Sequence, residues 1–164
     1  MVNTQVDLSA PGLSAREAIS PRLRRLTVVI LVLLAAQFLL GMTVNLFITV
    51  PTNHPGANPP EYFSGVFQSV RWAVTSSTSP LWLLLHASLG LGLVILTLAL
   101  LLSAIIARKG GWIAVASIGF IGVLGAGFNG GSFLNYNQNF SSMLMAVGFI
   151  LAMVTYSLGL ARGK

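Results

Sequence analysis

Two residues whose side chains can bind metal lie at matching depths in two apolar segments. His86 lies in the segment 81–107 and Met145 in the segment 141–161, each about one and a half helical turns from the same end. An imidazole in hydrocarbon needs a partner, so such a histidine is a candidate functional residue. Because histidine and methionine pairs hold haem iron, the pattern suggests a b-type haem with these two axial ligands.

Other interpretations of His86 stay open. The ring can instead join two helices through a hydrogen bond to a backbone carbonyl or an amide side chain. The candidate amides are Asn45 and Asn129. The iron can also be five-coordinate, or take Met42 or Met143 in place of Met145. A cluster of histidine and methionine also suits cuprous copper, although no Met-x-x-Met motif or histidine-rich tract supports it.

A weak internal repeat extends the candidate site. Residues 40–45 and 124–129 share the pattern Leu-Gly-x-x-x-Asn. If an axis along the membrane normal relates the first helix pair to the second, His86 aligns with Met145. Glycines in these helices permit close packing, which is their commoner role, or the approach of a flat ligand. The candidate cofactor-binding residues are His86, Met145, Asn45, Asn129, Gly41 and Gly125.

Polar groups outside this set gather toward one end of the apolar segments. They either satisfy one another or contact the edge of a ligand such as haem or quinone. We expect His54, in a Pro-rich stretch, to be a solvated turn residue, although the loop can also fold it over the pocket. Glu61 is expected to be a solvated charge. No acidic residue lies in an apolar segment and no base accompanies a nucleophile, so neither an ion-coupled carrier nor catalysis by side chains is expected.

Four apolar segments must position these residues. Hydrophobic residues make up 55% of the 164 residues and charged residues 7%, which excludes an ordinary soluble domain. Each segment is close to the roughly 20 residues that a spanning helix needs. We predict an all-α, integral membrane, four-helix up-down-up-down bundle that forms a single domain over 26–161. The spans are 26–50, 81–107, 112–131 and 141–161.

Charge and loop composition predict the topology. Basic residues cluster at 16–25, at 108–109 and at 162–164, which the positive-inside rule assigns to the cytoplasm. We therefore expect a plasma (cytoplasmic) membrane protein with a disordered cytoplasmic tail at 1–25 and a cytoplasmic end at 162–164. The external loop 51–80 should contain a short interfacial helix, because apolar residues recur there at helical spacing. The basic residues have no interleaved aromatics, so nucleic-acid binding is not expected.

The pattern resembles small four-helix membrane haem proteins, in particular one half of a bacterial heme A synthase. Gln37 and Gly41 in the first helix carry the resemblance, together with His86 and the following Leu89-Gly90 in the second. The resemblance implies haem ligands on the second and fourth helices. Met145 or a neighbour holds the fourth-helix position where that family has histidine, and the acidic and arginine residues of its catalytic motif are missing. Haem A synthesis is therefore not implied.

Two functions are compatible with these patterns. One is a b-type cytochrome-like protein that holds haem near the outer leaflet for electron transfer or redox sensing. The other is a non-enzymatic accessory subunit of a larger membrane complex, with His86 as a link between helices. Expected partners are lipid, another membrane protein or a second copy of the chain, with quinone as a possible ligand.

Overall fold

The computed structural model describes residues 20–162, which form five helices and no strand. The helices are α1 (Pro21–Phe47), α2 (Tyr62–Thr75), α3 (Leu81–Ile106), α4 (Gly110–Tyr136) and α5 (Asn139–Arg162). All but α2 are long and apolar enough to cross a membrane. The predicted all-α class and the four apolar helices are therefore confirmed, and they fit a multi-pass membrane protein. Residues 1–19 and 163–164, and with them most of the predicted tail, lie outside the described part.

Capping residues place the helix ends at different positions from the apolar segments. α1 begins at Pro21, where the Ser20 hydroxyl accepts a hydrogen bond from the Leu23 N–H at 3.3 Å. α4 continues to Tyr136, and the left-handed backbone of Asn137, with φ of 50°, ends it. Hydropathy marks the part of a helix that suits hydrocarbon, whereas the caps mark where its hydrogen bonds end.

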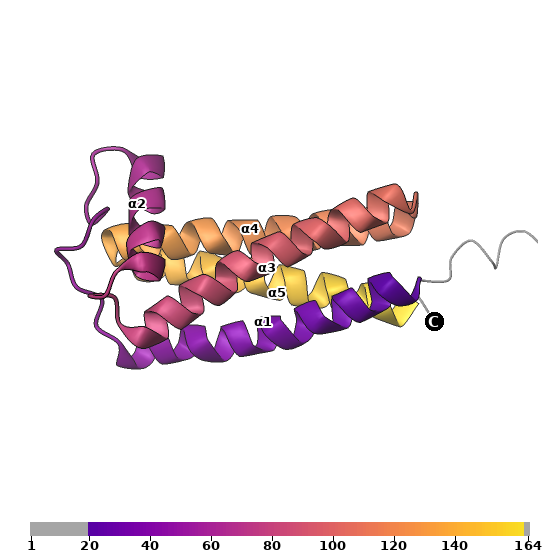
Figure 1. Cartoon of the computed structure of the whole chain (residues 1–164), viewed down its shortest axis with the longest axis horizontal. Helices are drawn as coiled ribbons and strands as arrows, with labels where there is room; N and C mark the ends of the chain where they lie inside the picture. The colour runs from indigo at the N-terminus through magenta and orange to yellow at the C-terminus, as the bar shows by residue number, and fades with distance from the viewer. Residues whose placement is uncertain (1–19, 163–164) are drawn as a thin grey trace, which may run out of the picture.

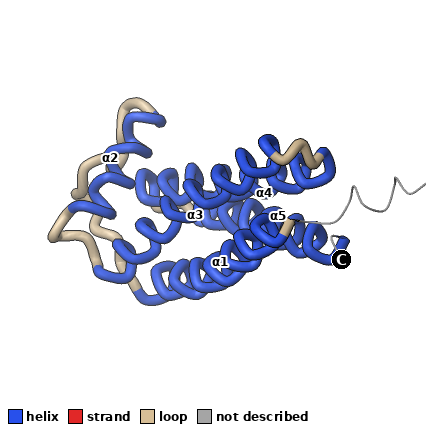
Figure 2. The backbone as a smooth tube through the Cα atoms, turned by 45° about the vertical axis from the view of Figure 1, so that its right-hand side comes forward, coloured by secondary structure: helices blue, strands red, loops and turns tan. Residues whose placement is uncertain are grey.

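The four long helices lie alongside one another and α2 crosses one end of them (Figure 1). α1 packs on α3 and α5, and α4 packs on the same two helices, so the long helices form a ring. Figure 2 shows the loop before α2 at the same end of the bundle as α2 itself. We call residues 51–75 the cap, the part of the bundle beneath them the cap half, and the opposite part the far half.

Buried side chains form two clusters that match these halves. The larger cluster fills the far half and includes Ile30, Leu100, Ala116 and Tyr156. The smaller cluster lies beneath α2. Its buried members are Val44, Trp72, Ala73, Leu83 and Leu134. Many large apolar side chains on the outside of the long helices are exposed, as is expected of surfaces that contact the bilayer.

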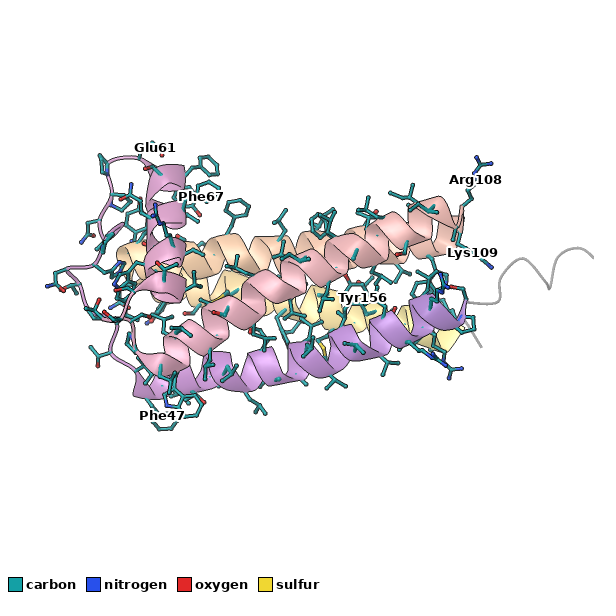
Figure 3. The ribbon with its side chains drawn as sticks, viewed as in Figure 1. Phe47, Glu61, Phe67, Arg108, Lys109 and Tyr156 are labelled. Atoms are coloured by element: carbon teal, nitrogen blue, oxygen red, sulfur yellow. The ribbon has the colours of Figure 1, made fainter. Side chains whose placement is uncertain are left out.

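Glycines let α4 and α5 approach closely near the middle of the bundle. A Cβ atom added at Gly122 would lie 2.7 Å from the carbonyl oxygen of Gly148, and one at Gly148 would lie 2.6 Å from that of Gly122. A Cβ at Gly119 would overlap the ring of Tyr156, which lies in the middle of the bundle in Figure 3. Small residues therefore set the separation of these two helices.

The short helix predicted within residues 51–80 is present as α2, and its apolar residues differ in burial. Val66, Trp72 and Ala73 are buried, whereas Phe63 is exposed and Phe67 is 66% exposed. Figure 3 shows Phe67 on the side of α2 that faces along the bundle. The small Gly65, Ser69 and Ala73 allow this helix to lie close to its neighbours, so Trp72 is buried while the rings of Phe63 and Phe67 stay exposed.

Candidate functional site

A cavity of about 460 Å³ lies within the cap half. All five helices contribute to its lining, which is almost entirely apolar. Its volume falls within the roughly 300–1,000 Å³ of typical ligand sites. No lysine, arginine, aspartate or glutamate lines it among the described residues. The polar side chains in the lining are Gln37, Asn45, His86 and Ser142.

The structure brings four of the six predicted cofactor-binding residues to this cavity. His86 and Met145 both line it, from α3 and α5, and so do Gly41 and Asn45 of α1. The two others are not in the lining. These are Gly125 and Asn129. Met42, one alternative ligand, also lines the cavity, whereas Met143 does not and is 54% exposed.

The only side-chain hydrogen bond of His86 in the described chain is to a residue of α1. Its Nε2 lies 3.4 Å from Nε2 of Gln37, so the amide N–H donates and the ring nitrogen accepts. This assignment leaves the ring proton on Nδ1, which is buried and has no partner among the described residues. The Gln37 Oε1 atom is likewise without a partner there. The amide partners that we expected, Asn45 and Asn129, are not used.

Glycines make room for this pair in a reciprocal way. A Cβ added at Gly41 would lie 2.9 Å from Cε1 of His86, and one at Gly90 would lie 3.1 Å from Nε2 of Gln37. His86 of α3 therefore lies against Gly41 of α1, and Gln37 of α1 lies against Gly90 of α3. On each helix the glycine follows the polar residue by four positions, which is about one turn. We call these four residues the α1–α3 clasp. The clasp fixes the imidazole at the wall of the cavity.

The internal repeat does not produce an equivalent clasp between α4 and α5. Met145 has its Sδ atom 3.3 Å from a Cβ added at Gly130, not beside Gly125. Asn129 donates to the Gly125 carbonyl of its own helix at 2.8 Å. Asn45 instead accepts from the Ser142 hydroxyl at 3.3 Å. The two copies of the motif therefore make different contacts.

The cavity fits a haem in part. His86 and Met145 reach it from helices that are not neighbours in the ring, and Nε2 of His86 is engaged only by one long hydrogen bond. Iron ligation through that atom would require the Gln37 amide to turn aside. Since the described lining has no cation, the haem propionates would belong at the edge of the cavity. The described residues contain no group of three or more His, Cys, Asp or Glu side chains that could hold another metal ion.

The cap is fixed to α4 by residues that the sequence did not single out for this role. His54 is 7% exposed, so the expectation of a solvated turn residue is wrong. Asn135 is 2% exposed, and its backbone oxygen accepts from the Asn58 N–H at 2.8 Å. Its side chain lies 2.6 Å from the Ser69 hydroxyl of α2. Glu61 is exposed as expected and caps the start of α2.

Comparison of the chain with protein-family models, with curated proteins and with solved structures finds no match.

Proposed function

We propose that this chain holds a b-type haem in the cap-half cavity and serves electron transfer or redox sensing beside a larger membrane partner. The observation that carries the proposal is that His86 and Met145, from two different helices, line one apolar cavity. When bound, haem supplies one-electron chemistry. His86 would hold the iron, Gln37 holds the imidazole at the cavity wall when no iron is bound, and the apolar lining excludes water. Met145 is the proposed second ligand, with Met42 as its alternative.

We further propose that the bundle runs up-down-up-down through the plasma membrane with both ends in the cytoplasm. Described basic residues at the start of α1, the α3–α4 turn and the end of α5 support this, because they belong to the end opposite α2. Arg108 and Lys109 lie at that end in Figure 3. The exposed Phe63 and Phe67 support a position of α2 in the outer interface, where aromatic rings are favourable.

A second candidate function is a non-enzymatic accessory subunit of a larger membrane complex. The α1–α3 clasp favours it, because a glutamine and a histidine that bond each other between helices are a common stabilising device in membranes. In this case His86 needs no ligand. The two functions differ in what occupies the cavity. A cofactor fills it in the first, and lipid or nothing fills it in the second.

The visible absorption spectrum of protein purified in mild detergent distinguishes the two functions. We expect a Soret band that changes on reduction and is lost in His86→Gly, with recovery when imidazole is added to that variant. Met145→Leu should alter the reduced spectrum or lower the potential, and no change would exclude Met145. A colourless but well-folded preparation would overturn the haem proposal and favour the accessory subunit. Metal analysis and lipid extraction of the same sample test copper and quinone.

Cysteine labelling tests the topology, since the chain has no native cysteine. Thr52 and Ala107 are both exposed and lie at opposite ends of the bundle. A reagent that cannot cross membranes should label Thr52→Cys in whole cells and should label Ala107→Cys only after the membrane is broken. The reverse pattern would invert the proposed orientation.

A further inference from the structure

Arg71 is the only lysine or arginine of the cap, and no contact within the protein explains its charge. The other cations of the described chain lie at the opposite end of the bundle, at the start of α1, in the α3–α4 turn and at the end of α5. Arg71 is exposed on α2, and its guanidinium has no hydrogen bond or ion pair among the described residues. Its backbone carbonyl alone is engaged by a side chain, the Thr75 hydroxyl at 2.8 Å. The guanidinium can therefore bind an anion from outside the chain.

The acidic residue of the cap does not neutralise this charge. Glu61 is the only acidic residue of the described chain, and its carboxylate accepts from the N–H groups of Phe63 and Ser64 at the start of α2. Glu61 and Arg71 are ten positions apart in the sequence, which corresponds to about 15 Å along a helix. Charges at that separation are largely screened, since the Debye length is about 8 Å at physiological ionic strength.

The cavity of the cap half reaches the surface beside α2, where α2, α3 and α4 pack on one another. One exposed residue of the lining comes from each of these helices, namely Phe67, Leu91 and Gly127. We call these three residues the α2 mouth. Arg71 directly follows the lining residue Val70 and lies one turn after Phe67, so it adjoins the α2 mouth on the surface of its helix. A molecule that fills the cavity and extends through this mouth therefore passes beside a positive charge.

The edge of the cavity on the other side of the ring carries no charge. Its exposed lining residues belong to α1 and α5 and are Phe38, Met42, Asn45 and Ala146. The Asn45 amide already accepts a hydrogen bond from the Ser142 hydroxyl of α5 at 3.3 Å. At this edge an acid group would find amide and hydroxyl partners, whereas at the α2 mouth it would find a guanidinium. Because a guanidinium pairs with a carboxylate through two parallel N–H donors, the acid group is favoured at the α2 mouth.

We propose that Arg71 binds the acid group of an amphipathic ligand whose apolar body fills the cavity. The described lining has no cation, so the apolar part is favoured inside and the acid group at the mouth. Under the haem function proposed above, on which this identity of the ligand rests, the acid group is a haem propionate. A fatty acid presents the same chemistry, a carboxylate on an apolar body. Arg71 therefore determines specificity for acids and is separate from the proposed iron ligands.

Probes that differ only in charge test this contact on the full chain in neutral detergent at about pH 8, where carboxyl groups are ionised. The first pair is haem b and its dimethyl ester, titrated by visible absorption. We expect the unmodified chain to bind the free acid about fivefold more tightly than Arg71→Gln does, because an exposed ion pair is worth up to about that factor. The ester should bind both chains equally. Arg71→Lys should keep part of the gain, since lysine retains the charge but not the parallel donors.

A control variant and a second pair of probes separate the possible causes. Arg108→Gln removes the same charge at the opposite end of the bundle (Figure 3), so it should bind acid and ester as the unmodified chain does. A fluorescent fatty acid and its methyl ester form the second pair. An effect of Arg71→Gln on the fatty acid, with no binding of haem to any chain, would overturn the haem function and support the Arg71 site.

Equal affinity of the unmodified chain and Arg71→Gln for both free acids would overturn the proposal. A loss that is as large for the esters would also overturn it, because Arg71 would then act on the fold alone. Failure of the folded chain to bind any of the probes would overturn both this proposal and the haem function. Salt dependence gives a measurement that needs no variant, since salt should weaken binding of the acid more than binding of the ester. Equal salt dependence of acid and ester would contradict the ion pair.

Discussion

In the far half of the bundle, side chains fill the space between the helices, whereas in the cap half a cavity of about 460 Å³ separates them. α4 runs through both halves and carries glycines in each. Gly119 and Gly122 have no room for a Cβ atom, but Gly125 and Gly127 have nothing within 4 Å of one. Within this one helix, glycine therefore allows close packing at Gly119 and Gly122 and leaves open space at Gly125 and Gly127.

The two halves also contain polar side chains that differ in whether they bond within one helix or between helices. Buried hydroxyls of the far half mostly bond their own helix, as Thr27 does to the Leu23 carbonyl at 2.8 Å and Thr97 to the Leu93 carbonyl at 2.8 Å. In the cap half, Gln37 and His86 bond between helices. Thr27 and Thr97 therefore leave the helices free to pack through apolar contacts, whereas Gln37 and His86 join α1 to α3 beside the cavity.

The largest expected effect comes from adding one methyl group to the far half. Gly119→Ala places a Cβ atom into the ring of Tyr156 and should lower the free energy of unfolding by about 3 kcal/mol. Gly125→Ala, on the same helix but facing open space, should be neutral or raise it by up to about 1 kcal/mol. Unfolding titrations in mixed detergent measure both. Equal losses in the two variants would contradict the contrast between the halves.

If haem occupies the cavity as proposed, filling the cavity should block its binding without disturbing the fold. Gly127 lines the cavity and has space around its Cβ position, so Gly127→Leu should reduce haem bound per chain more than about tenfold. Gly125→Leu is the matched control, because it has similar space but does not line the cavity. Helix content by circular dichroism should be unchanged in both. Normal haem content in Gly127→Leu would place the ligand elsewhere.

Removing one oxygen atom from the far half should stabilise the protein. Tyr156 is fully buried and its hydroxyl has no partner among the described residues. Tyr156→Phe therefore removes an unsatisfied polar group and should raise the free energy of unfolding by about 1 kcal/mol. The same unfolding titration measures this gain. A loss of stability would mean that the hydroxyl is hydrogen-bonded in the membrane.

The smallest expected effect is the coupling across the α1–α3 clasp. A double-mutant cycle with Gln37→Leu and His86→Leu should give an interaction energy of about 0.6 kcal/mol, the average for polar bonds between membrane helices. The cycle is measured on cofactor-free protein, so that loss of a ligand does not add to it. A coupling near zero would remove the support that the clasp gives to the accessory-subunit function.

Part of the lining of the cavity was predictable from residue type and depth. A histidine in hydrocarbon must meet a partner, and this is why His86 and, through the repeat, Met145 were found. Gln37 was named only through a resemblance, because depth alone does not say which amide faces the ring. Gly125 and Asn129 share their motif with Gly41 and Asn45 but do not line the cavity. Whether these residues face the cavity depends on the rotation of each helix about its axis. The four-residue spacing between the glycine and the asparagine does not determine that rotation.

The sequence alone determined the number of apolar helices, because each must provide a long hydrocarbon-compatible surface and satisfy its own backbone. Only the tertiary structure decided which glycines pack and which leave space, because that depends on the separation of two helices that are distant in sequence. The burial of His54 is a second example. Its partners, Trp72 and Leu134, lie on two other elements, and the loop reaches them only when the bundle is assembled.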